Sequence, residues 1–491
     1  MNAVAQTSRG SLRWPAAPRP PVPLSLWTAQ AIAVATGGQA SGAFQVSGVE
    51  IDSRDVRSGD LFVALAGETT DGHAFLAKAF ANGAAAALVD RPVPYPHVLV
   101  ADTFAALQAL AATARGRVPK ARIVGVTGSV GKTGVKEAIF ATLQRHAAGH
   151  AHRSIRSYNN HVGVPLSLAR MPAASRYGVF EMGMNHAGEI AGLTAQVRPH
   201  VAVITTVAPA HIENLGSMAA IADAKAEIFA GLAPGGTAVI PADSPHFEQL
   251  RDAALAASAR ILSFGSAAHA DMQLVDAIPA ANGGSLVTAR LGDRHLCYNV
   301  AHPGEHWVAN SLCVMAAVHA AGADLGAAGL ALAEMGGLKG RGARLRVPVP
   351  GGHALFIDES YNANPASMRA TLAQLGQTPA TRRIAVLGSM KELGEFAPSF
   401  HAQLADPLAA AGVDHAVLVG PEMTALAGEL GKAVRRALGK PAGFVHCTGS
   451  GEAIAALEDW GLTAGDVVLV KGSNSIGLGQ VIAHFAQKTA D

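Results

Sequence analysis

The sequence predicts an α/β protein of three domains, and three observations support this prediction. The chain has 491 residues, enough for about three domains of ordinary size. Apolar runs of strand length alternate with helical stretches along most of the chain, as in folds with mostly parallel sheets. A phosphate-binding motif, TGSVGKT, lies at residues 127–133 between one such strand and one such helix.

The composition excludes several classes of protein. Hydrophobic residues make up 49% and charged residues 15% of the chain, which indicates a folded globular protein. A net charge of +2 gives no strong field, so nucleic acid is not expected as a partner. The three cysteines, Cys297, Cys313 and Cys447, have no metal-binding spacing and are interpreted as reduced thiols of a cytoplasmic protein.

Two segments of the chain are candidates for secretory or membrane segments, and neither fits. Residues 1–24 are rich in proline and arginine and lack the apolar stretch of a secretory signal, so they are interpreted as a disordered lead-in. The most apolar window, 312–334, is interrupted by His319, Asp324 and glycines. No membrane insertion is therefore expected.

The first predicted domain spans residues 25–117. Thr28 is a candidate N-cap for a helix that ends at Gly37 and Gly38. A strand is expected at 60–65 and a helix from about residue 74.

The central domain, predicted at 118–345, opens with the phosphate-binding loop. Apolar residues 123–126 form its strand, and helix-forming residues continue through Thr142. Backbone N–H groups of such a loop hold phosphate oxygens, Lys132 reaches the β- and γ-phosphates, and the Thr133 hydroxyl can hold Mg²⁺. Val126 stands where the strict motif has glycine. The chain is therefore predicted to bind a nucleoside triphosphate.

Three further polar residues follow in the central domain. Glu181 ends the strand YGVFEMG, His211 follows the strand HVAVITTV, and Lys225 lies on a helix. Taken singly, each has an ordinary explanation: a carboxylate at a strand end, a loop histidine and a solvated lysine. Mg²⁺ prefers oxygen ligands, which argues against His211 on general grounds.

The last domain, predicted at 346–491, contains five apolar runs that indicate a separate open sheet: HALFIDE, RRIAVLGSM, DHAVLVGP, GFVHC and DVVLVKGS. Polar loops follow three of them, and DESYNANP is the most distinctive. Because ligands gather at the carboxyl ends of parallel strands, these loops predict a second binding surface facing the phosphate-binding loop. The alternative is that the Asp and Asn residues only cap helices.

Eight motifs in this order resemble the ATP-dependent Mur ligases of peptidoglycan synthesis: TGSVGKT, EMGMNHAGEI, APAHIENLGSMAAIADAKAEI, HPGEHWVAN, KGRGARL, DESYNANPASM, VLGSMKELG and LVKGS. The resemblance extends from residue 25 to the C-terminus. SYNANP together with GSMKELG most resembles the branch of the family that joins D-alanyl-D-alanine to UDP-N-acetylmuramoyl-tripeptide.

The resemblance implies a fold and a reaction. An N-terminal domain would bind the UDP-sugar, the central domain ATP, and a Rossmann-like C-terminal domain would close over the nucleotide. A peptide carboxylate would attack the γ-phosphate to give an acyl phosphate, which the incoming amine would attack in turn. Lys132 and metal ions would offset the repulsion between the two anions.

The resemblance also implies roles for individual residues. ATP would be bound by the loop Thr127, Gly128, Ser129, Val130, Gly131, Lys132 and Thr133, with His306 and Asn310 near the adenine, Arg341 at the phosphates and Asp358 at the ribose. Thr133 and Glu181 would hold one Mg²⁺ ion. His211 and a carbamylated Lys225 would hold a second. The catalytic residues would be Lys132, His211 and Lys225. Ser53, Arg54, Asp71, Gly72 and His73 would bind the UDP-sugar, Asn159 and Asn160 would line the substrate channel, and Asn362, Asn364 and Lys471 would place the dipeptide.

Two kinds of alternative remain at this point. Another amide ligase of the family, for third-residue addition or folylpolyglutamate synthesis, would share most motifs. A P-loop regulatory or transport ATPase would share only the nucleotide site. The expected protein is a cytoplasmic monomer.

Overall fold

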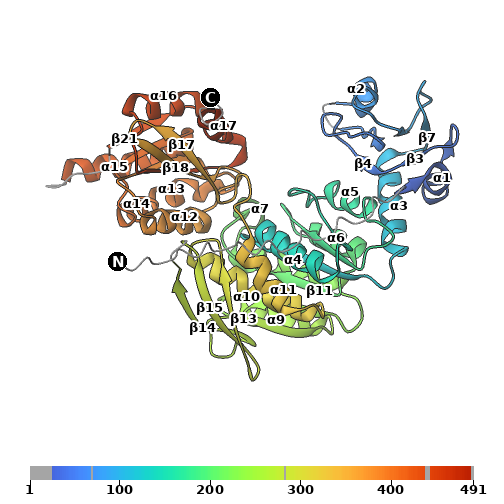
Figure 1. The fold of residues 1–491 in the computed structure, drawn as a ribbon, viewed down its shortest axis with the longest axis horizontal. Coiled ribbons are helices and arrows are strands. Elements are labelled where there is room, and N and C mark those ends of the chain that lie inside the picture. The colour runs from blue at the N-terminus through green and yellow to red at the C-terminus, as the bar shows by residue number, and fades with distance from the viewer. Residues whose placement is uncertain (1–24, 68–69, 281–282, 437–442, 488–491) are drawn as a thin grey trace, which may run out of the picture.

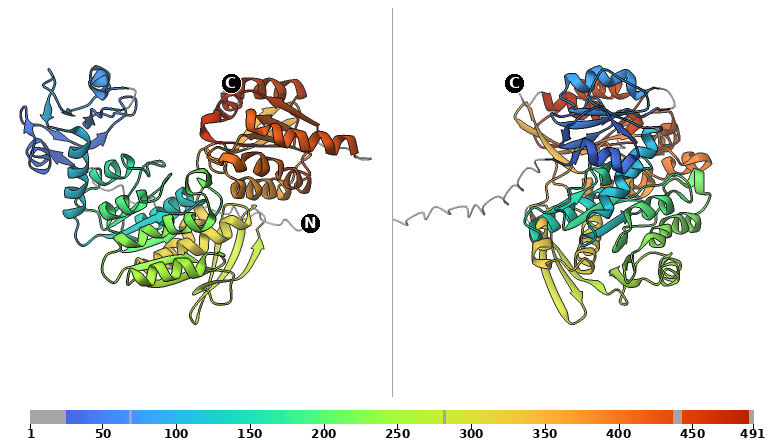
Figure 2. Two further views of the ribbon diagram at one scale, coloured as in Figure 1. Left: turned by 180° about the vertical axis from the view of Figure 1, so that it is seen from behind. Right: turned by 90° about the vertical axis from the view of Figure 1, so that its right-hand side faces the viewer.

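The computed structural model describes residues 25–67, 70–280, 283–436 and 443–487, so the predicted lead-in at 1–24 lies outside the described residues. Figure 1 shows three successive units, and the reverse view in Figure 2 shows the same arrangement. The N-terminal unit (blue) and the C-terminal unit (orange to red) lie at opposite ends of the central unit. Each unit contains a largely parallel sheet with helices, which confirms the α/β prediction.

The N-terminal unit is built on a sheet with the strand order β2-β7-β6-β5-β4, in which only β2 is antiparallel to its neighbour. The predicted cap is confirmed, because the Thr28 hydroxyl accepts a hydrogen bond from Ala31 N and Gly37 ends the helix at φ 68°. The elements are β1 (Trp27–Thr28), α1 (Ala29–Thr36), β2 (Gln39–Ala40), β3 (Gln45–Val46), β4 (Gly48–Glu50), β5 (Asp60–Val63), a 3-10 helix (Gly72–Phe75), α2 (Leu76–Ala81), β6 (Ala86–Val89), β7 (His97–Leu99) and α3 (Thr103–Gly116).

The central unit holds a nine-stranded sheet in the order β16-β15-β14-β13-β12-β11-β8-β10-β9. The strand that leads into the phosphate-binding loop, β8, has β10 on one side and β11 on the other, so the strand order reverses around it. Ligands of open α/β sheets bind at such a switch point.

The elements of the central unit are β8 (Arg122–Thr127), α4 (Lys132–His146), β9 (Ala151–Arg153), α5 (Gly163–Ala169), β10 (Tyr177–Glu181), α6 (Glu189–Val197), β11 (Val201–Ile204), α7 (Ile212–Leu215), α8 (Met218–Ala226), a 3-10 helix (Glu227–Gly231), β12 (Thr237–Pro241), α9 (Phe247–Ala256), β13 (Arg260–Gly265), β14 (Met272–Pro279), β15 (Ser285–Leu291), β16 (Arg294–Val300), α10 (Glu305–Ala320) and α11 (Leu325–Glu334).

Two features of this unit bear on the sequence predictions. The antiparallel strands β14, β15 and β16, which extend the sheet at one edge, were not predicted. The apolar window at 312–334 belongs to α10 and α11, and α10 is buried along most of its length against α4 and the sheet. Among the described residues, no helix has the length and hydropathy needed to cross a membrane.

The C-terminal unit contains a six-stranded sheet in the order β17-β18-β22-β19-β20-β21, in which the five predicted strands are all present and parallel. A sixth strand, β17 (Ala343–Val349), pairs antiparallel with β18. Since β17 belongs to this sheet, we propose that the domain boundary lies before Ala343 rather than near residue 346.

The remaining elements of this unit are β18 (Gly352–Glu359), α12 (Pro365–Gln377), β19 (Arg382–Gly388), α13 (Ala397–Ala402), α14 (Ala405–Ala410), β20 (His415–Val419), α15 (Thr424–Arg436), β21 (Gly443–Cys447), α16 (Ser450–Trp460), β22 (Asp466–Lys471) and α17 (Gly479–Gln487), with short 3-10 helices at Gly394–Phe396, Pro421–Met423 and Asn474–Ile476.

A buried ion pair at the start of β22 anchors the C-terminal sheet. Asp466 is fully buried and accepts hydrogen bonds from the Arg382 guanidinium at 2.6 and 3.1 Å and from Thr463 N at 2.8 Å. We expect Asp466→Asn to lower the free energy of unfolding of this unit by about 1.5–3 kcal/mol, the range for hydrogen bonds to a charged group. Urea unfolding followed by the fluorescence of Trp460, which packs on His415 in the same unit, measures this change.

The matched control is Glu429→Gln, which makes the same acid-to-amide change in an exposed pair with Lys432 of the same unit. It should change the free energy of unfolding by less than about 0.5 kcal/mol. Equal effects of the two variants would contradict the anchoring role of Asp466.

Candidate active site

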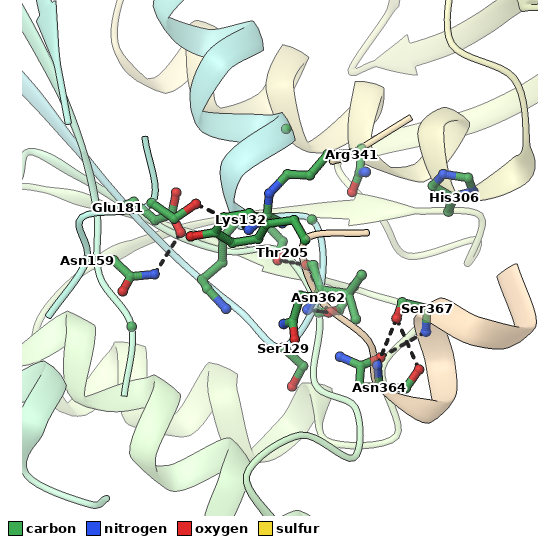
Figure 3. A pocket seen from close by; sticks show the side chains of 18 of the residues that line it. Ser129, Lys132, Asn159, Glu181, Thr205, His306, Arg341, Asn362, Asn364 and Ser367 are labelled. Carbon is green, nitrogen blue, oxygen red and sulfur yellow. Dashed lines mark hydrogen bonds between the residues drawn. The ribbon is translucent and has the colours of Figure 1, made fainter. Parts of the chain in front are cut away.

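A cavity of about 450 Å³ lies at the carboxyl ends of the central strands, where loops of the central and C-terminal units meet (Figure 3). Its walls come from the phosphate-binding loop, the ends of β10 and β11, the start of α10, and the segments after α11 and β18. The predicted site residues that line it are Ser129, Val130, Gly131, Lys132, Asn159, Asn160, Glu181, His211, His306, Asn310, Arg341, Asn362, Asn364 and Lys471.

The phosphate-binding loop has the predicted conformation. Gly131, the N-cap of α4, adopts φ 87°, and a Cβ atom at Gly128 would lie 2.0 Å from the Thr205 hydroxyl. The loop is held by the next strand end, because Val130 N donates to the Thr206 hydroxyl at 3.0 Å. Val126, the departure from the strict motif, is a fully buried strand residue and lies before the turn. A side chain is tolerated there for that reason.

Lys132 is positioned for an anion. Its Nζ donates to the carbonyl oxygen of Gly128 at 2.6 Å, and its side chain lines the cavity (Figure 3). Burial lowers the pKa of this lysine, and the carboxylate of Glu181 opposes that shift. A bound polyphosphate would supply the missing negative charge and hold the lysine in its charged form.

Glu181 lines the cavity, and Thr133 contacts its carboxylate without lining the cavity itself. The Thr133 hydroxyl donates to Glu181 Oε2 at 2.9 Å, and Asn159 Nδ2 donates to Glu181 Oε1 at 2.8 Å (Figure 3). Glu181 is 1% exposed. Among the described residues, no cluster of three His, Cys, Asp or Glu side chains has metal-binding geometry. A metal here would therefore need phosphate or water oxygens as well, as Mg²⁺ commonly does.

His211 and Lys225 have different surroundings. His211 lines the cavity in a left-handed conformation, φ 59°, and its Nδ1 lies 2.6 Å from Oε2 of Glu392 in the C-terminal unit. Lys225 does not line the cavity and is 1% exposed, so its interpretation as a solvated residue is wrong. Burial, reinforced by Lys132, brings the pKa of Lys225 well below its usual value.

The start of α10 forms another wall. His306 and Asn310 line the cavity together with Trp307. Trp307 stacks on His302, with ring centroids 4.2 Å apart, and a Cβ atom at Gly134 would lie 2.9 Å from its indole. His302 therefore covers one face of this indole, and a side chain at position 134 would collide with its six-membered ring. Burial lowers the pKa of His306 to about 4, so its imidazole is neutral near pH 7.

Arg341 connects the two units at the cavity. Its guanidinium donates to the Ser157 hydroxyl of the central unit at 3.2 Å and lies over the ring of Tyr361 in the C-terminal unit, 4.4 Å from the centroid. Figure 3 shows its side chain directed toward Lys132 and Glu181. The arginine thus depends on both units for its position.

Two acidic residues end β18, and only one of them reaches the cavity. Asp358 is 3% exposed, and its carboxylate accepts from Gly340 N at 2.8 Å and from the Ser360 hydroxyl at 2.6 Å. Asp358, the predicted ribose contact, therefore holds the turn behind the wall. Glu359 lines the cavity instead, 3.6 Å from Lys471 Nζ, and burial raises the pKa of its carboxyl.

The SYNANP loop combines structural and cavity-lining roles. Asn364 is the N-cap of α12, and a capping box with Ser367 uses its side-chain oxygen. Both asparagines, Asn362 and Asn364, nevertheless line the cavity. Lys471 Nζ donates to the carbonyl oxygen of Asn362 at 2.9 Å.

The predicted UDP-sugar residues form a separate group in the N-terminal unit. Ser53 and Arg54 follow β4, while Asp71, Gly72 and His73 follow β5, so all lie toward the carboxyl edge of that sheet. The His73 ring lies between two carboxylates, 2.7 Å from Asp71 and 3.1 Å from Asp90. None of these residues lines the central cavity, and Arg54 points to solvent in a pair with Asp52.

Several cavity residues were given no role in the site from the sequence: Ser157, Glu189, Glu359, Tyr361 and Ser367. Ser157 lies two residues before Asn159, whereas Glu189 lies eight residues after Glu181, the nearest residue that was given a role. The motifs EMGMNHAGEI and DESYNANPASM already contained four of the five. Considering every polar side chain of a motif would have found them.

Family models match most of the chain. Residues 45–122 match the Mur ligase family catalytic domain, residues 126–318 the Mur ligase middle domain, and residues 344–474 the Mur ligase glutamate ligase domain. The chain is 36% identical over 393 residues to the UDP-N-acetylmuramoyl-tripeptide–D-alanyl-D-alanine ligase of Escherichia coli K12, covering 79% of this chain and 85% of that one. It is 33% identical over 450 residues to the ligase of the same name from Bacillus subtilis, covering 90% and 93%.

Solved structures agree with these matches. MurF from Acinetobacter baumannii superposes with a TM-score of 0.80 at 31% identity, over 94% of this chain and 99% of that one. MurF ligase from Thermotoga maritima in complex with ADP superposes with a TM-score of 0.72 at 27% identity, over 90% and 97%. The family models, these relatives and the cavity at the phosphate-binding loop lead to one assignment: this chain belongs to the Mur ligase family.

Proposed function

We propose that this protein joins D-alanyl-D-alanine to UDP-N-acetylmuramoyl-tripeptide at the expense of ATP, in peptidoglycan precursor synthesis. It is an ATP-dependent ligase that forms an amide C–N bond. The observation that carries this proposal is the single cavity in which the phosphate-binding loop meets polar loops of the C-terminal unit. The relatives from Escherichia coli and Bacillus subtilis that bear this function in their names are covered to 85% and 93% of their own length by this chain.

The nucleotide would lie across the central unit. Backbone N–H groups of the loop and the N-terminus of α4 would hold the β- and γ-phosphates, with Lys132 and Arg341 supplying positive charge. His306 and Asn310 would approach the adenine. We assign the ribose contact to Glu359 in place of Asp358, because Glu359 lines the cavity whereas the carboxylate of Asp358 is occupied by the turn.

Thr133 and Glu181 fit an Mg²⁺ ion bound together with ATP. They offer a hydroxyl and a carboxylate oxygen 2.9 Å apart at the end of the phosphate-binding loop. The ion would supply charge neutralisation at the phosphates. Asn159 would keep the carboxylate of Glu181 directed toward the cavity through its 2.8 Å hydrogen bond.

The reaction would proceed through an acyl phosphate. The terminal carboxylate of the tripeptide attacks the γ-phosphorus, the bond to the β-γ bridging oxygen breaks, and ADP leaves. The dipeptide amine then attacks the acyl carbon, and the tetrahedral intermediate expels phosphate as the amide forms. Lys132 would stabilise the charge that develops on the transferred phosphoryl group.

After carbamylation by CO₂, Lys225 would offer oxygen atoms as ligands for a second metal ion. Only the neutral amine reacts, and the lowered pKa of this buried lysine supports that step. The carbamate, with His211, would hold a second Mg²⁺ ion. For this role the imidazole of His211 must turn from Glu392, which lies 2.6 Å from its Nδ1.

The two other substrates would enter from opposite units. Asn362, Asn364 and Lys471 would place the dipeptide, while Asn159 and Asn160 would line the path of the sugar-peptide. Ser53, Arg54, Asp71, Gly72 and His73 would bind the UDP-sugar, in agreement with their common position at the carboxyl edge of the N-terminal sheet.

We also propose that the protein acts as a monomer in the cytoplasm, without membrane insertion or nucleic acid. All residues assigned above come from one chain. The three cysteines are unpaired, which suits a reducing compartment.

ATP turnover should require both of the other substrates. Arg341 takes its position from two units, so the phosphate site is complete only when the units are held together. Phosphate release should rise at least about 10-fold when UDP-tripeptide and D-alanyl-D-alanine are both present. Equal ATP hydrolysis by the protein alone would contradict ligation and favour a P-loop ATPase of another kind.

Lys225→Ala should lower kcat by about 10²-fold, the usual effect of losing a preorganised charge contact. Small carboxylates such as formate or acetate should restore part of the activity by offering the oxygens of the lost carbamate. Lys225→Arg should remain inactive and without rescue, since its guanidinium keeps its charge and forms no carbamate.

Mass spectrometry under gentle conditions supplies an independent readout, because a carbamate adds the mass of one CO₂ to Lys225. Normal ligation by Lys225→Arg, or unmodified Lys225 in fully active protein, would exclude the carbamate.

A further inference from the structure

Lys136 is a buried cation that the proposed reaction does not use. It lies one turn after Lys132 on α4 and is 0% exposed. Its Nζ donates to the carbonyl oxygens of Ser154 at 3.0 Å and Arg156 at 2.6 Å, and it lies 2.9 Å from a carboxylate oxygen of Glu137 and 3.9 Å from Oε2 of Glu181. A buried ammonium is costly unless it is paired and hydrogen-bonded, so these contacts account for its burial.

The two carbonyl groups belong to residues 154–160, hereafter the bridging segment, which follows β9. The inner side of this segment holds the phosphate site. The Ser154 hydroxyl accepts from Glu181 N at 3.1 Å, and Asn159 donates to the Glu181 carboxylate at 2.8 Å. Ser157 contacts the Thr133 hydroxyl at 3.2 Å.

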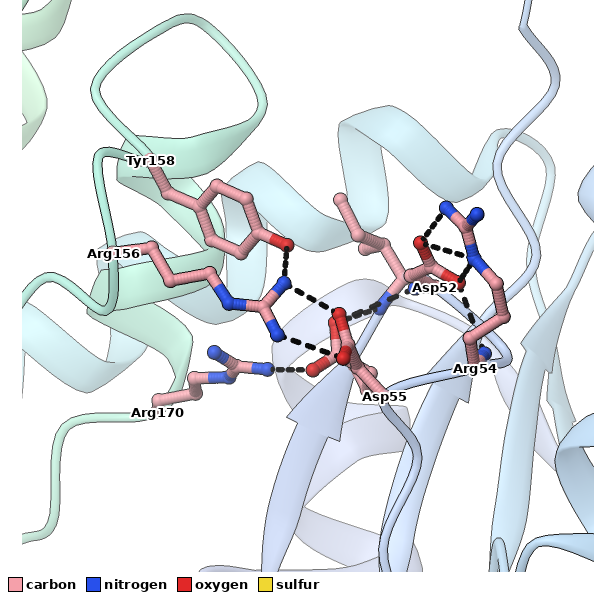
Figure 4. A network of polar contacts seen from close by, with 8 residues as sticks. Asp52, Arg54, Asp55, Arg156, Tyr158 and Arg170 are labelled. Atoms are coloured by element: carbon pink, nitrogen blue, oxygen red, sulfur yellow. Dashed lines mark hydrogen bonds and ion pairs between the residues drawn. The ribbon is translucent and has the colours of Figure 1, made fainter. Parts of the chain in front are cut away.

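The outer side of the bridging segment holds the N-terminal unit. Arg156 forms a bidentate ion pair with Asp55, with N–O distances of 2.6 and 2.7 Å, and also contacts the Tyr158 hydroxyl (Figure 4). Arg170 makes a second ion pair between the units, with Glu50 at 2.5 Å. A cavity of about 430 Å³ lies between these pairs.

Arg156 adopts a left-handed backbone conformation, φ 53°, which is unfavourable for a residue with a side chain. Lys136 holds the carbonyl groups of this residue and of Ser154, two residues before it. The ammonium therefore fixes the backbone at the point where the side chain turns outward to Asp55 while Ser157 and Asn159 turn inward.

We propose that Lys136 is a positioning residue that couples docking of the N-terminal unit, through the bridging segment, to the geometry of Glu181 and Thr133. Binding of the UDP-tripeptide at the N-terminal unit and of Mg²⁺-nucleotide at the phosphate-binding loop then favour each other. This inference rests on the proposed function for the identity of the two ligands, and its test measures binding without ligation.

Calorimetric titration tests the coupling with Mg²⁺·ADP and UDP-N-acetylmuramoyl-tripeptide as probes. In the unaltered protein, each probe should tighten the binding of the other by about 5-fold or more, a common size for coupling between two sites. Lys136→Met keeps the length of the side chain and removes its donors. This variant should bind both probes more weakly, and each probe should tighten the binding of the other by less than about 2-fold.

Asp55→Asn changes the other end of the connection, at a partly exposed residue far in sequence from the phosphate-binding loop. It should weaken Mg²⁺·ADP binding measurably although Asp55 does not line the nucleotide cavity. In the Lys136→Met background the same change should have no further effect on Mg²⁺·ADP, because contributions along one connection are not additive.

The control is Arg145→Met, which removes a cation from the same helix where it forms an exposed pair with Glu334. Both affinities and their coupling should stay unchanged in this variant. Lys136→Arg, which keeps the charge and the donors, should retain part of the coupling.

The outcomes separate a positioning role from a packing role. A lower melting temperature of Lys136→Met with unchanged affinities and coupling would overturn the proposal. If Lys136→Met does not fold, Asp55→Asn decides: unchanged Mg²⁺·ADP affinity in that variant contradicts the coupling. Failure of the protein to ligate, with coupled binding of both probes, would reject the proposed function and leave the role of Lys136 intact.

Discussion

The hydrogen bond between Thr133 and Glu181 is the contact on which the rest of the site depends. It joins the first turn of α4 to the end of β10 and brings together two oxygen donors at the phosphate-binding loop. The sheet fixes this contact, because Glu181 pairs in register with Val126 of β8, one residue before the loop begins. Glu181 then lines the cavity beside Lys132 of the phosphate-binding loop and Asn159.

Two lysines on the walls of this cavity would be stabilised by a bound polyanion. Lys132, Arg341 and Lys471 line the cavity, while the carboxylates of Glu181, Glu189 and Glu359 are the acidic groups on its walls. Burial lowers the pKa of both Lys132 and Lys471, which means that each ammonium is incompletely compensated in the protein alone. Phosphate groups would complete the compensation, so nucleotide binding and the charged state of these lysines reinforce each other.

Much of the fold could be predicted because its signals are local. The motif at 127–133, the cap at Thr28 and the five apolar runs of the C-terminal unit each depend on residues close in sequence, and the structure contains all of them. The antiparallel edge strands β14 to β16 were missed because polar side chains stand among their apolar residues and most of their positions are at least partly exposed. Their pairing is determined by the neighbouring strands of the sheet and not by their own amino-acid composition.

The site was harder to predict where the direction of a side chain decides its role. Asp358 and Glu359 are adjacent, but successive strand residues point to opposite sides, and the sequence does not say which one reaches the cavity. Lys136 and Lys225 look like ordinary helix lysines, yet both are buried by contacts between distant segments. Their burial became visible only in three dimensions, and it supports the roles proposed for them.

The central claim is that the tripeptide carboxylate is activated by phosphoryl transfer at the Lys132 and Glu181 site. It is tested most directly by ligation with UDP-tripeptide labelled with ¹⁸O in its terminal carboxylate, followed by mass analysis of the released phosphate. The account predicts one ¹⁸O atom in each phosphate, because the carboxylate oxygen that attacks phosphorus leaves with it. Phosphate without the label, released as the amide forms, would contradict the acyl phosphate and with it the arrangement of the site described above.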